Sequence, residues 1–323
     1  MTRSLTDLTA ALQQCYARGG VNDPKNALPD RESVARICQK LLAILFPGFS
    51  TAERVAMSQL EAHTLRQLSE LKELLFEQVA RGQRSAERLT GASASPKLLE
   101  EVRSQVLDML YELVTVRELV ESDLQAAFDN DPAAVDRETI LLSYPSIEAL
   151  AVQRFAHRLY RRGVAIVPRM MTEFVHGNTG IDIHPGAAID ESFFIDHGTG
   201  VVIGETSRIG KRCVLYQGVG MAAWNPLKKD AKGELARGQS NKRHPDLEDR
   251  VTVYAGATIL GGDTVVGHHS VIGGSVWLTH SVAPYSVVTI KEPQLEIHQR
   301  VAKPSARVSA RRPPVGHARP KPD

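Results

Sequence analysis

The stretch DIHPGAAIDESFFIDHGTG, residues 182–200, twice places an aspartate beside or near a histidine. The pairs are Asp182 with His184 and Asp196 with His197. An imidazole, whose ordinary pKa lies near about 6.5, can act as a general base, and a carboxylate can fix its tautomer. The same residue types also bind metal ions or remain solvated at a surface. The scaffold decides which of these side chains can meet.

Composition indicates a globular chain long enough for two domains. Of its 323 residues, 42% are hydrophobic and 24% are charged, and the formal net charge is 39 − 37 = +2. This charge favours no nucleic-acid partner, and no apolar run is long enough for a membrane span or a secretory signal. Three widely spaced cysteines (Cys15, Cys38 and Cys213) are typical of free thiols. We therefore expect a soluble cytoplasmic protein that binds neither nucleic acid nor membrane.

The first half of the chain reads as helix. ESVARICQKLLAILF, at 32–46, has apolar residues at helical spacing, and a second helix is indicated by Leu60 and by leucines that recur every three residues from Leu65 to Leu74. We expect that second helix to end at Gly82, and a third to begin with Ser95 as N-cap and Pro96 at its first position. A further helix is predicted from about Ser146 to Arg162. The predicted helical domain spans 31–178, after a partly disordered segment at 1–30.

The second half has a six-residue period in place of a helical one. The first block is carried by Ile183, Ile189, Ile195 and Val201, then, after a two-residue slip, by Ile203, Ile209 and Leu215. The period returns at Val253, Ile259, Val265 and Val271. It predicts coils of three short strands stacked into a prism with an apolar core. The predicted prism spans 179–292 with an extruded loop at 221–242, and a basic, Pro-rich tail follows at 293–323.

Three motifs in this second half of the chain, with a fourth in the helical half, resemble the serine O-acetyltransferase family of hexapeptide-repeat acyltransferases. They are DNDPAAVD at 129–136, DIHPGAAI at 182–189, IDHGTGVVIGET at 195–206 and KRHP at 242–245. The resemblance implies an α+β fold in which a helical domain precedes a left-handed parallel β-helix. It also implies acetyl transfer from acetyl-CoA, as co-substrate, to the hydroxyl of L-serine, with no permanently bound cofactor and no metal.

The resemblance assigns the catalytic roles residue by residue. His197 is implied as the general base, and Asp182 as the carboxylate that orients it. Asp131 and Asp196 are implied to hold the serine amino group; an N-cap before Pro132 is the alternative for Asp131. Arg243 suits the substrate carboxylate because a guanidinium can bind it in a bidentate manner, and His244 is implied as a second contact.

The donor contacts and the assembly also follow from the resemblance. Acetyl-CoA is expected to lie between neighbouring prisms of a homotrimer, or of a dimer of trimers, against Ala222, Ala223, Ala255, Gly273 and Gly274. Many relatives end in an isoleucine that docks into O-acetylserine sulfhydrylase. This chain ends Lys321-Pro322-Asp323, so that complex is not expected.

Three other functions compete with this interpretation. A related transferase would act on a sugar, a drug or another amino acid, although Asp131 and Arg243 favour a zwitterionic acceptor. A zinc enzyme resembling γ-carbonic anhydrase would need converging imidazoles, for which His197, His244 and His268 are candidates. We expect His268 and His269 to be exposed on opposite sides of their coil and therefore not to share an ion. A non-catalytic scaffold would instead act through the basic tail.

Overall fold

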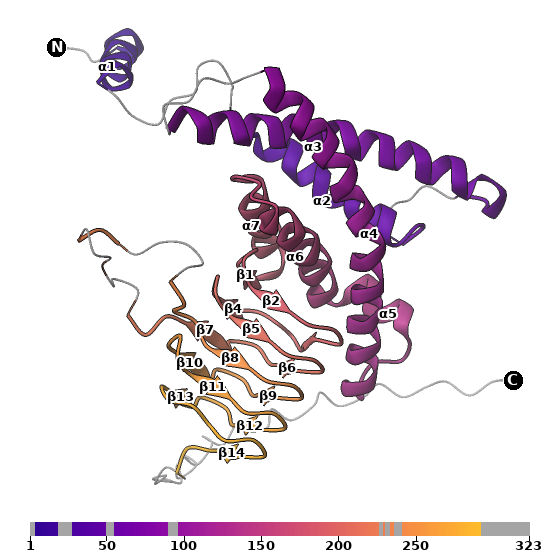
Figure 1. Ribbon diagram of the computed structural model, residues 1–323, viewed down its shortest axis with the longest axis vertical. Coiled ribbons are helices and arrows are strands. Elements are labelled where there is room, and N and C mark those ends of the chain that lie inside the picture. The colour runs from indigo at the N-terminus through magenta and orange to yellow at the C-terminus, as the bar shows by residue number, and fades with distance from the viewer. Residues whose placement is uncertain are drawn as a thin grey trace, which may run out of the picture. The chain divides into compact units, whose positions relative to one another are not determined.

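The computed structural model describes residues 4–18, 28–49, 55–89, 96–225, 229, 233–235 and 241–291. The predicted basic tail, the chain's C-terminal residues and much of the loop at 221–242 lie outside the described residues. Helices make up the first part of the described chain and short parallel strands the second (Figure 1). None of the described helices combines the length and apolar character that a membrane span requires.

In the part of the chain that the structure describes, seven α-helices and a 3₁₀ turn precede the strands. They are α1 (Leu5–Ala17), α2 (Arg31–Leu45), η1 (Met57–Gln59), α3 (Leu60–Leu89), α4 (Pro96–Asn130), α5 (Arg137–Ser143), α6 (Pro145–Arg161) and α7 (Val167–Thr179). Asp30 caps α2 by accepting a 2.8 Å hydrogen bond from the Ser33 N–H, and Asp136 caps α5. Gly180, in the left-handed conformation, ends α7.

The prediction that the second helix ends at Gly82 was wrong, because α3 continues to Leu89. A Cβ at Gly82 would lie 2.7 Å from the carbonyl oxygen of Ala165, in the segment that joins α6 to α7. The glycine therefore permits a close approach between α3 and that connection. A glycine inside a helix pattern marks close packing as well as an end.

The strands are short and regularly spaced. They are β1 (Asp182–Ile183), β2 (Ala188–Ile189), β3 (Phe194–Ile195), β4 (Val202–Ile203), β5 (Arg208–Ile209), β6 (Val214–Leu215), β7 (Gly220–Ala222), β8 (Asp246–Leu247), β9 (Thr252–Val253), β10 (Thr258–Leu260), β11 (Val265–Val266), β12 (Val271–Ile272), β13 (Trp277–Leu278) and β14 (Val287–Val288). All the strand pairs are parallel, and every third strand pairs with its equivalent in the next coil.

The strands form the three faces of a left-handed β-helix, as the six-residue period and the family resemblance predicted. Face A has the order β1-β4-β7-β10-β13, face B contains β2, β5, β8 and β11, and face C contains β3, β6, β9, β12 and β14. Figure 1 shows the coils stacked in chain order, with β1 near the helices and β14 at the far end. One apolar residue per strand points inward, for example Ile203, Ile259 and Ile272, all buried.

The two-residue slip in the period lies at the first turn from face C to face A. Successive strands begin six residues apart at β1, β2 and β3, but β4 begins at Val202, eight residues after Phe194. The additional residues enlarge a turn that contains Asp196 and His197. His197 there has a φ of 59°, in the left-handed region. A Cβ at Gly198 would lie 2.5 Å from Ile181 Cδ1, so this enlarged turn needs the glycine that follows the histidine.

A buried ion pair joins the helices to the first coil. The Asp123 carboxylate of α4 accepts two 2.7 Å hydrogen bonds from the Arg154 guanidinium of α6, and both side chains are buried. Arg154 also donates to the carbonyl oxygens of Ile189 (2.9 Å) and Asp190 (2.8 Å), and Asp123 accepts from the Phe193 N–H (3.0 Å). The pair therefore fixes two helices and the turn before β3 to one another.

Apolar packing also joins the helices to the first coil of the β-helix. Ala149 and Leu150 of α6 are buried in the core of the β-helix, together with Ile181 and Phe193. Phe194, from β3, is buried instead in the core of the helices. Each of the two parts therefore contributes buried side chains to the core of the other.

Replacing Arg154 with methionine should lower the free energy of unfolding by about 3–5 kcal/mol, because it leaves the Asp123 carboxylate buried without its cation. Urea denaturation followed by circular dichroism would measure the loss. Lys211→Met is the matched control: its ion pair with Glu191 lies on the surface, so little or no loss is expected. Equal losses in the two variants would contradict a structural role for the buried pair.

Candidate active site

The turns that follow β3, β6, β9 and β12 form one edge of the β-helix, which we call the His197 edge. Strand register aligns Ile195 with Leu215, Leu215 with Val253 and Val253 with Ile272. The residues two positions further along are therefore equivalent in successive coils: His197, Gln217, Ala255 and Gly274. The residues one position along are Asp196, Tyr216, Tyr254 and Gly273.

Two carboxylates from different elements approach His197. Asp196 precedes it in the same turn, and its Oδ2 lies 3.7 Å from His197 Nε2. Asp131 follows the last residue of α4, and the charge of His197 helps to lower the pKa of its carboxyl. The larger causes of that lowered pKa are hydrogen bonds from the Tyr144 hydroxyl and the Ala133 N–H. The structure thus brings Asp131, Asp196 and His197 into one cluster.

Asp131 does not cap a helix, which was the alternative reading of its position before Pro132. The N-cap of α5 is Asp136. Asp131 instead accepts a 2.8 Å hydrogen bond from the Ala133 N–H through Oδ1 and one from the Tyr144 hydroxyl through Oδ2. The hydrogen bond from Tyr144 raises the pKa of its phenol to about 12, so the phenol remains a donor. Both contacts stabilise the ionised carboxylate.

An aromatic pair lies next to this cluster. Tyr216 and Tyr254, one coil apart, stack with their ring centroids 5.0 Å apart and an angle of 6° between the ring planes. Burial raises the pKa of Tyr216, and the charges of Asp196 and Asp131 add to the shift. The rings therefore form one wall beside the two acids.

Asp182 lies on face A, and the structure joins it to a different partner from the one expected. Its Oδ1 accepts a 3.1 Å hydrogen bond from Arg169 of α7, and no hydrogen bond to His197 is present among the described residues. Arg169 also pairs with Glu173, which in turn lies 3.3 Å from His176 Nδ1. In the described part of the chain, one trio of ligand-type atoms lies within 4.8 Å of one another, from Glu173, His176 and Asp182. The Arg169 guanidinium already neutralises both acids, so we do not assign a metal ion there.

A second edge, the Arg243 edge, is formed by the turns that follow β1, β4, β7 and β10. Arg243 pairs there with Glu205, whose other oxygen accepts a 2.5 Å hydrogen bond from the Tyr160 hydroxyl of α6. His184 lies beside them, its ring packed edge-on against Tyr160. Burial lowers the pKa of His184, and its Nδ1 accepts a 3.0 Å hydrogen bond from the Gly186 N–H.

His244 is buried on the same edge. Its Nδ1 accepts a 3.1 Å hydrogen bond from the Thr206 N–H, while the Thr206 hydroxyl accepts from the Arg243 and His244 N–H groups. Burial, aided by the Arg243 charge, lowers the pKa of His244 to about 4. A Cβ at Gly204 would lie 2.0 Å from the His244 ring, so that position must be glycine. The ring is therefore neutral at physiological pH, with its proton on Nε2.

The predicted site residues thus divide between two edges of one chain. Asp131, Asp196 and His197 lie at the His197 edge, and Arg243 and His244 at the other, with Asp182 on face A between the edges. The expected donor contacts divide in the same way. Ala255, Gly273 and Gly274 follow His197 down its edge, whereas Ala222 and Ala223 lie where β7 leaves face A toward the Arg243 edge.

The expectation that His268 and His269 point to opposite sides of their coil was wrong. Their Nδ1 atoms lie 3.0 Å apart, and both rings pack against Tyr285. His269 has a φ of 60°, and this left-handed turn breaks the alternation of side chains that an extended strand would impose. The zinc alternative also lacks support in a single chain: no trio of imidazoles converges among the described residues.

Sequence reasoning missed Tyr144, Tyr160 and Glu205. Glu205 lies inside the motif IDHGTGVVIGET, but the motif alone did not give it a role. The two tyrosines come from α6 and the residue before it, outside the four motifs. Only the fold places their hydroxyls on Asp131 and Glu205.

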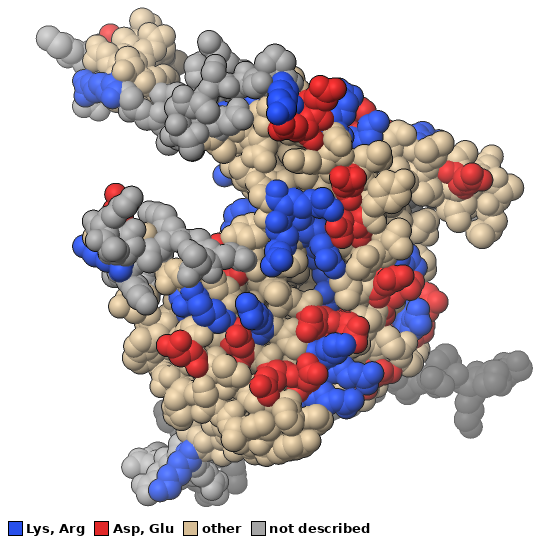
Figure 2. Space-filling view, in the orientation of Figure 1, with Lys and Arg blue, Asp and Glu red and all other residues tan. Residues whose placement is uncertain are grey.

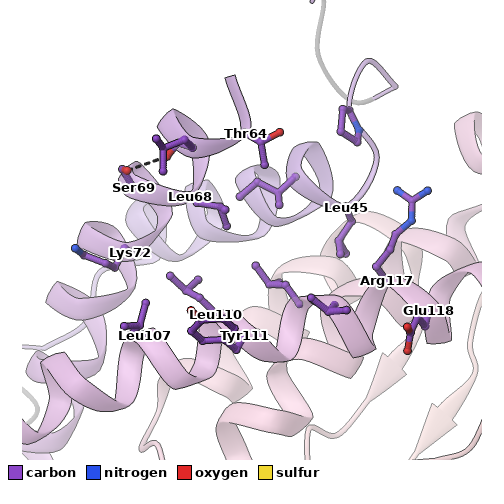
Figure 3. A pocket seen from close by; sticks show the side chains of 15 residues that line it. Leu45, Thr64, Leu68, Ser69, Lys72, Leu107, Leu110, Tyr111, Arg117 and Glu118 are labelled. Carbon is purple, nitrogen blue, oxygen red and sulfur yellow. Dashed lines mark hydrogen bonds between the residues drawn. The ribbon is translucent and has the colours of Figure 1, made fainter. Parts of the chain in front are cut away.

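An apolar groove lies elsewhere, among α2, α3 and α4. It has a volume of about 930 Å³, and Figure 3 shows Leu45, Leu68, Leu107, Leu110 and Tyr111 around it, with Arg117 and Glu118 at one end. None of the predicted site residues lines it. On the face drawn in Figure 2, basic and acidic side chains are interspersed over the β-helix.

Comparisons with known proteins place the chain among named relatives. A Synechococcus elongatus protein named "Serine acetyltransferase, plasmid" is 42% identical over 271 residues, covering 83% of this chain and 84% of the relative. The serine acetyltransferase of Bacillus subtilis is 38% identical over 170 residues, covering 53% of this chain and 72% of the relative. No model of a protein family matched the chain.

A solved structure agrees with these relatives. The crystal structure of Entamoeba histolytica serine acetyltransferase 1 in complex with L-cysteine superposes with a TM-score of 0.67 and 35% sequence identity. The superposition covers 79% of this chain and 86% of that one. The relatives and the solved structure agree on one family, and this chain has the fold of that family. The chain therefore belongs to the serine acetyltransferase family.

Proposed function

We propose that this chain transfers the acetyl group of acetyl-CoA to the hydroxyl of L-serine, giving O-acetyl-L-serine and CoA. The observation that carries the proposal is the cluster in which Asp131 and Asp196 approach His197. Two carboxyl side chains beside an exposed imidazole suit an acceptor with an ammonium group next to a hydroxyl. A neutral sugar, one of the competing acceptors, offers no cation for these acids.

His197 acts first as a general base and then as a general acid. A serine hydroxyl is a poor nucleophile at neutral pH, so the imidazole removes its proton as the oxygen attacks the thioester carbonyl. The tetrahedral intermediate then loses the CoA sulfur, which takes the proton back from His197. The new ester bond forms as the thioester bond breaks, and the enzyme returns to its starting protonation state.

The two acids hold the acceptor by its ammonium group. Tyr144 and the Ala133 N–H keep Asp131 ionised, and Asp196 faces the same cluster. The Entamoeba relative was crystallised with L-cysteine, which differs from serine only in having sulfur in place of the hydroxyl oxygen. The same contacts would hold either amino acid.

Asp182 orients His197 in this proposal. Its Oδ1 accepts a hydrogen bond from Arg169, and its Oδ2 is the atom that would accept from the imidazole. An acid held in this way stabilises the imidazolium that forms during the reaction.

Arg243 and His244 bind the substrate carboxylate. The guanidinium provides a charged, planar set of donors. His244 contributes as a neutral donor, because its Nδ1 is occupied by the Thr206 N–H and its proton lies on Nε2. Its lowered pKa means that it does not compete with His197 for the role of base.

One chain does not bring the cluster around His197 together with Arg243 and His244, because the two sets of residues lie on opposite edges of face A. We therefore propose a homotrimer in which the Arg243 edge of one copy completes the His197 edge of the next. The His197 side chain is 70% exposed in the single chain, as a residue covered by a second copy would be. The apolar groove among α2, α3 and α4 offers a further contact for a dimer of trimers.

Acetyl-CoA occupies the boundary between copies in the same proposal. Ala255, Gly273 and Gly274 line the path that descends from His197, and small residues there leave room for the pantetheine chain. Ala222 and Ala223 of the neighbouring copy face it from the other side. The chain needs no resident cofactor for this chemistry.

His197→Ala should lower serine-dependent release of CoA by about 10²–10⁴-fold, the usual contribution of a general base. Thiol release from acetyl-CoA would be measured with L-serine, homoserine, a hexosamine and no acceptor. His268→Ala, in a turn far down the β-helix, is the control and should match the parent. Equal rates with every acceptor, or full activity in His197→Ala, would overturn the proposed function.

Mixing inactive His197→Ala and Arg243→Ala chains should restore activity if each site is shared. Random reassembly from denaturant places an intact His197 edge against an intact Arg243 edge at about one quarter of the boundaries in the trimer. About a quarter of the parental rate is therefore expected after co-refolding. A mixture as inactive as its components would place the complete site within one chain.

Stability should fall between pH 6.5 and pH 4 because of His244. Its pKa is lowered to about 4 in the folded chain, so over this range the unfolded chain binds a proton that the folded chain does not. The parent should lose on the order of 3 kcal/mol from this residue as the pH falls through that window. His244→Asn keeps an acceptor near Thr206 but cannot titrate. Between pH 6.5 and pH 4, this variant should lose less stability than the parent, as measured by urea denaturation. Parallel curves of stability against pH for the two proteins would contradict the assignment.

A further inference from the structure

Glu205 is a buried acid that the proposed chemistry does not use. It is 8% exposed, and it follows the close-packed Gly204 on the Arg243 edge. Both of its oxygens are bonded: Oε1 accepts from the Tyr160 hydroxyl at 2.5 Å, and Oε2 accepts from Arg243 Nη2. A carboxylate in such a place is costly unless its partners stabilise it.

The partners keep Glu205 ionised. Burial alone favours the protonated acid, but hydrogen bonds from Tyr160 and Arg243 hold the pKa of Glu205 below its ordinary value. An ionised Glu205 restricts the Arg243 guanidinium, since a charge-assisted hydrogen bond fixes the direction of one arm of the group. A second bond, from Arg243 Nη1 to the carbonyl oxygen of Asn241 at 3.3 Å, restricts the other arm.

We infer that Glu205, held by Tyr160, is a positioning residue that sets the plane of the Arg243 guanidinium toward the carboxylate of the amino-acid acceptor. This inference rests on the proposed function. A guanidinium carries five N–H donors, so Arg243 can bond Glu205 and a substrate carboxylate at the same time. Because Tyr160 belongs to α6, the acceptor-binding arginine is anchored to the helical part of the chain.

Two other roles for Glu205 predict different behaviour. If it bound the acceptor ammonium directly, it would need an oxygen facing the substrate, yet both oxygens are directed to Tyr160 and Arg243. If it served only to stabilise the fold, its loss would reduce the amount of active protein. That would lower the apparent kcat and leave the KM for serine unchanged.

The test is steady-state kinetics of the full-length Glu205→Gln variant, with L-serine and acetyl-CoA varied separately. The KM for L-serine should rise about tenfold, the effect of losing a hydrogen bond to a charged group, with kcat within about twofold of the parent. The KM for acetyl-CoA should not change. Tyr160→Phe should shift the KM for serine in the same direction by a smaller factor.

Two controls separate the possible outcomes. Glu191→Gln, at an exposed turn, should behave as the parent, and Glu205→Gln combined with Arg243→Lys should raise the KM no further than Arg243→Lys alone. An unchanged KM for serine in Glu205→Gln, or a drop in kcat alone, would overturn the inference. A parent enzyme without serine-dependent CoA release would instead overturn the proposed function.

Discussion

The ion pair between Asp123 and Arg154 fixes the geometry on which the candidate site depends. It joins α4, α6 and the first coil of the β-helix through hydrogen bonds to both side chains and to three backbone groups. Asp131 follows directly after α4, and Tyr144 precedes α6. The acid that approaches His197 and the phenol that holds it therefore lie next to the ends of the two helices that this pair holds together. A shift of either helix would move Asp131 relative to His197.

Local backbone geometry determines the position of His197. The enlarged turn after β3 displaces His197 from the regular path of the coil and holds it in a left-handed conformation, which is uncommon for a non-glycine residue. Strained conformations of this kind persist where the surroundings fix them, and here Gly198 packs against Ile181. The slip that interrupts the six-residue period in the sequence is thus the feature that presents the imidazole.

The sequence was informative where a residue's role depends on local pattern. The six-residue period predicted the β-helix because each coil repeats the same inward position, and the family motifs predicted which acids and histidines to examine. Contacts between distant elements were not predictable. The hydroxyls of Tyr144 and Tyr160 reach Asp131 and Glu205 only through the packing of α6, and Asp182 bonds Arg169 of α7. The paired rings of His268 and His269 depend on the left-handed conformation of His269, in the turn that precedes β12.

The division of the site between two edges links the proposed chemistry to assembly. The His197 edge offers a base and negative charge for an ammonium group, whereas the Arg243 edge offers positive charge for a carboxylate. An amino acid carries both charges on neighbouring atoms, so in the proposed homotrimer it would bridge the two edges where separate copies bring them together. In that proposed assembly, substrate binding and association of the copies would stabilise each other by mass action, because each would supply contacts that the other needs. On the proposed function, discrimination in favour of a zwitterion therefore resides at the boundary between copies and not in either edge alone.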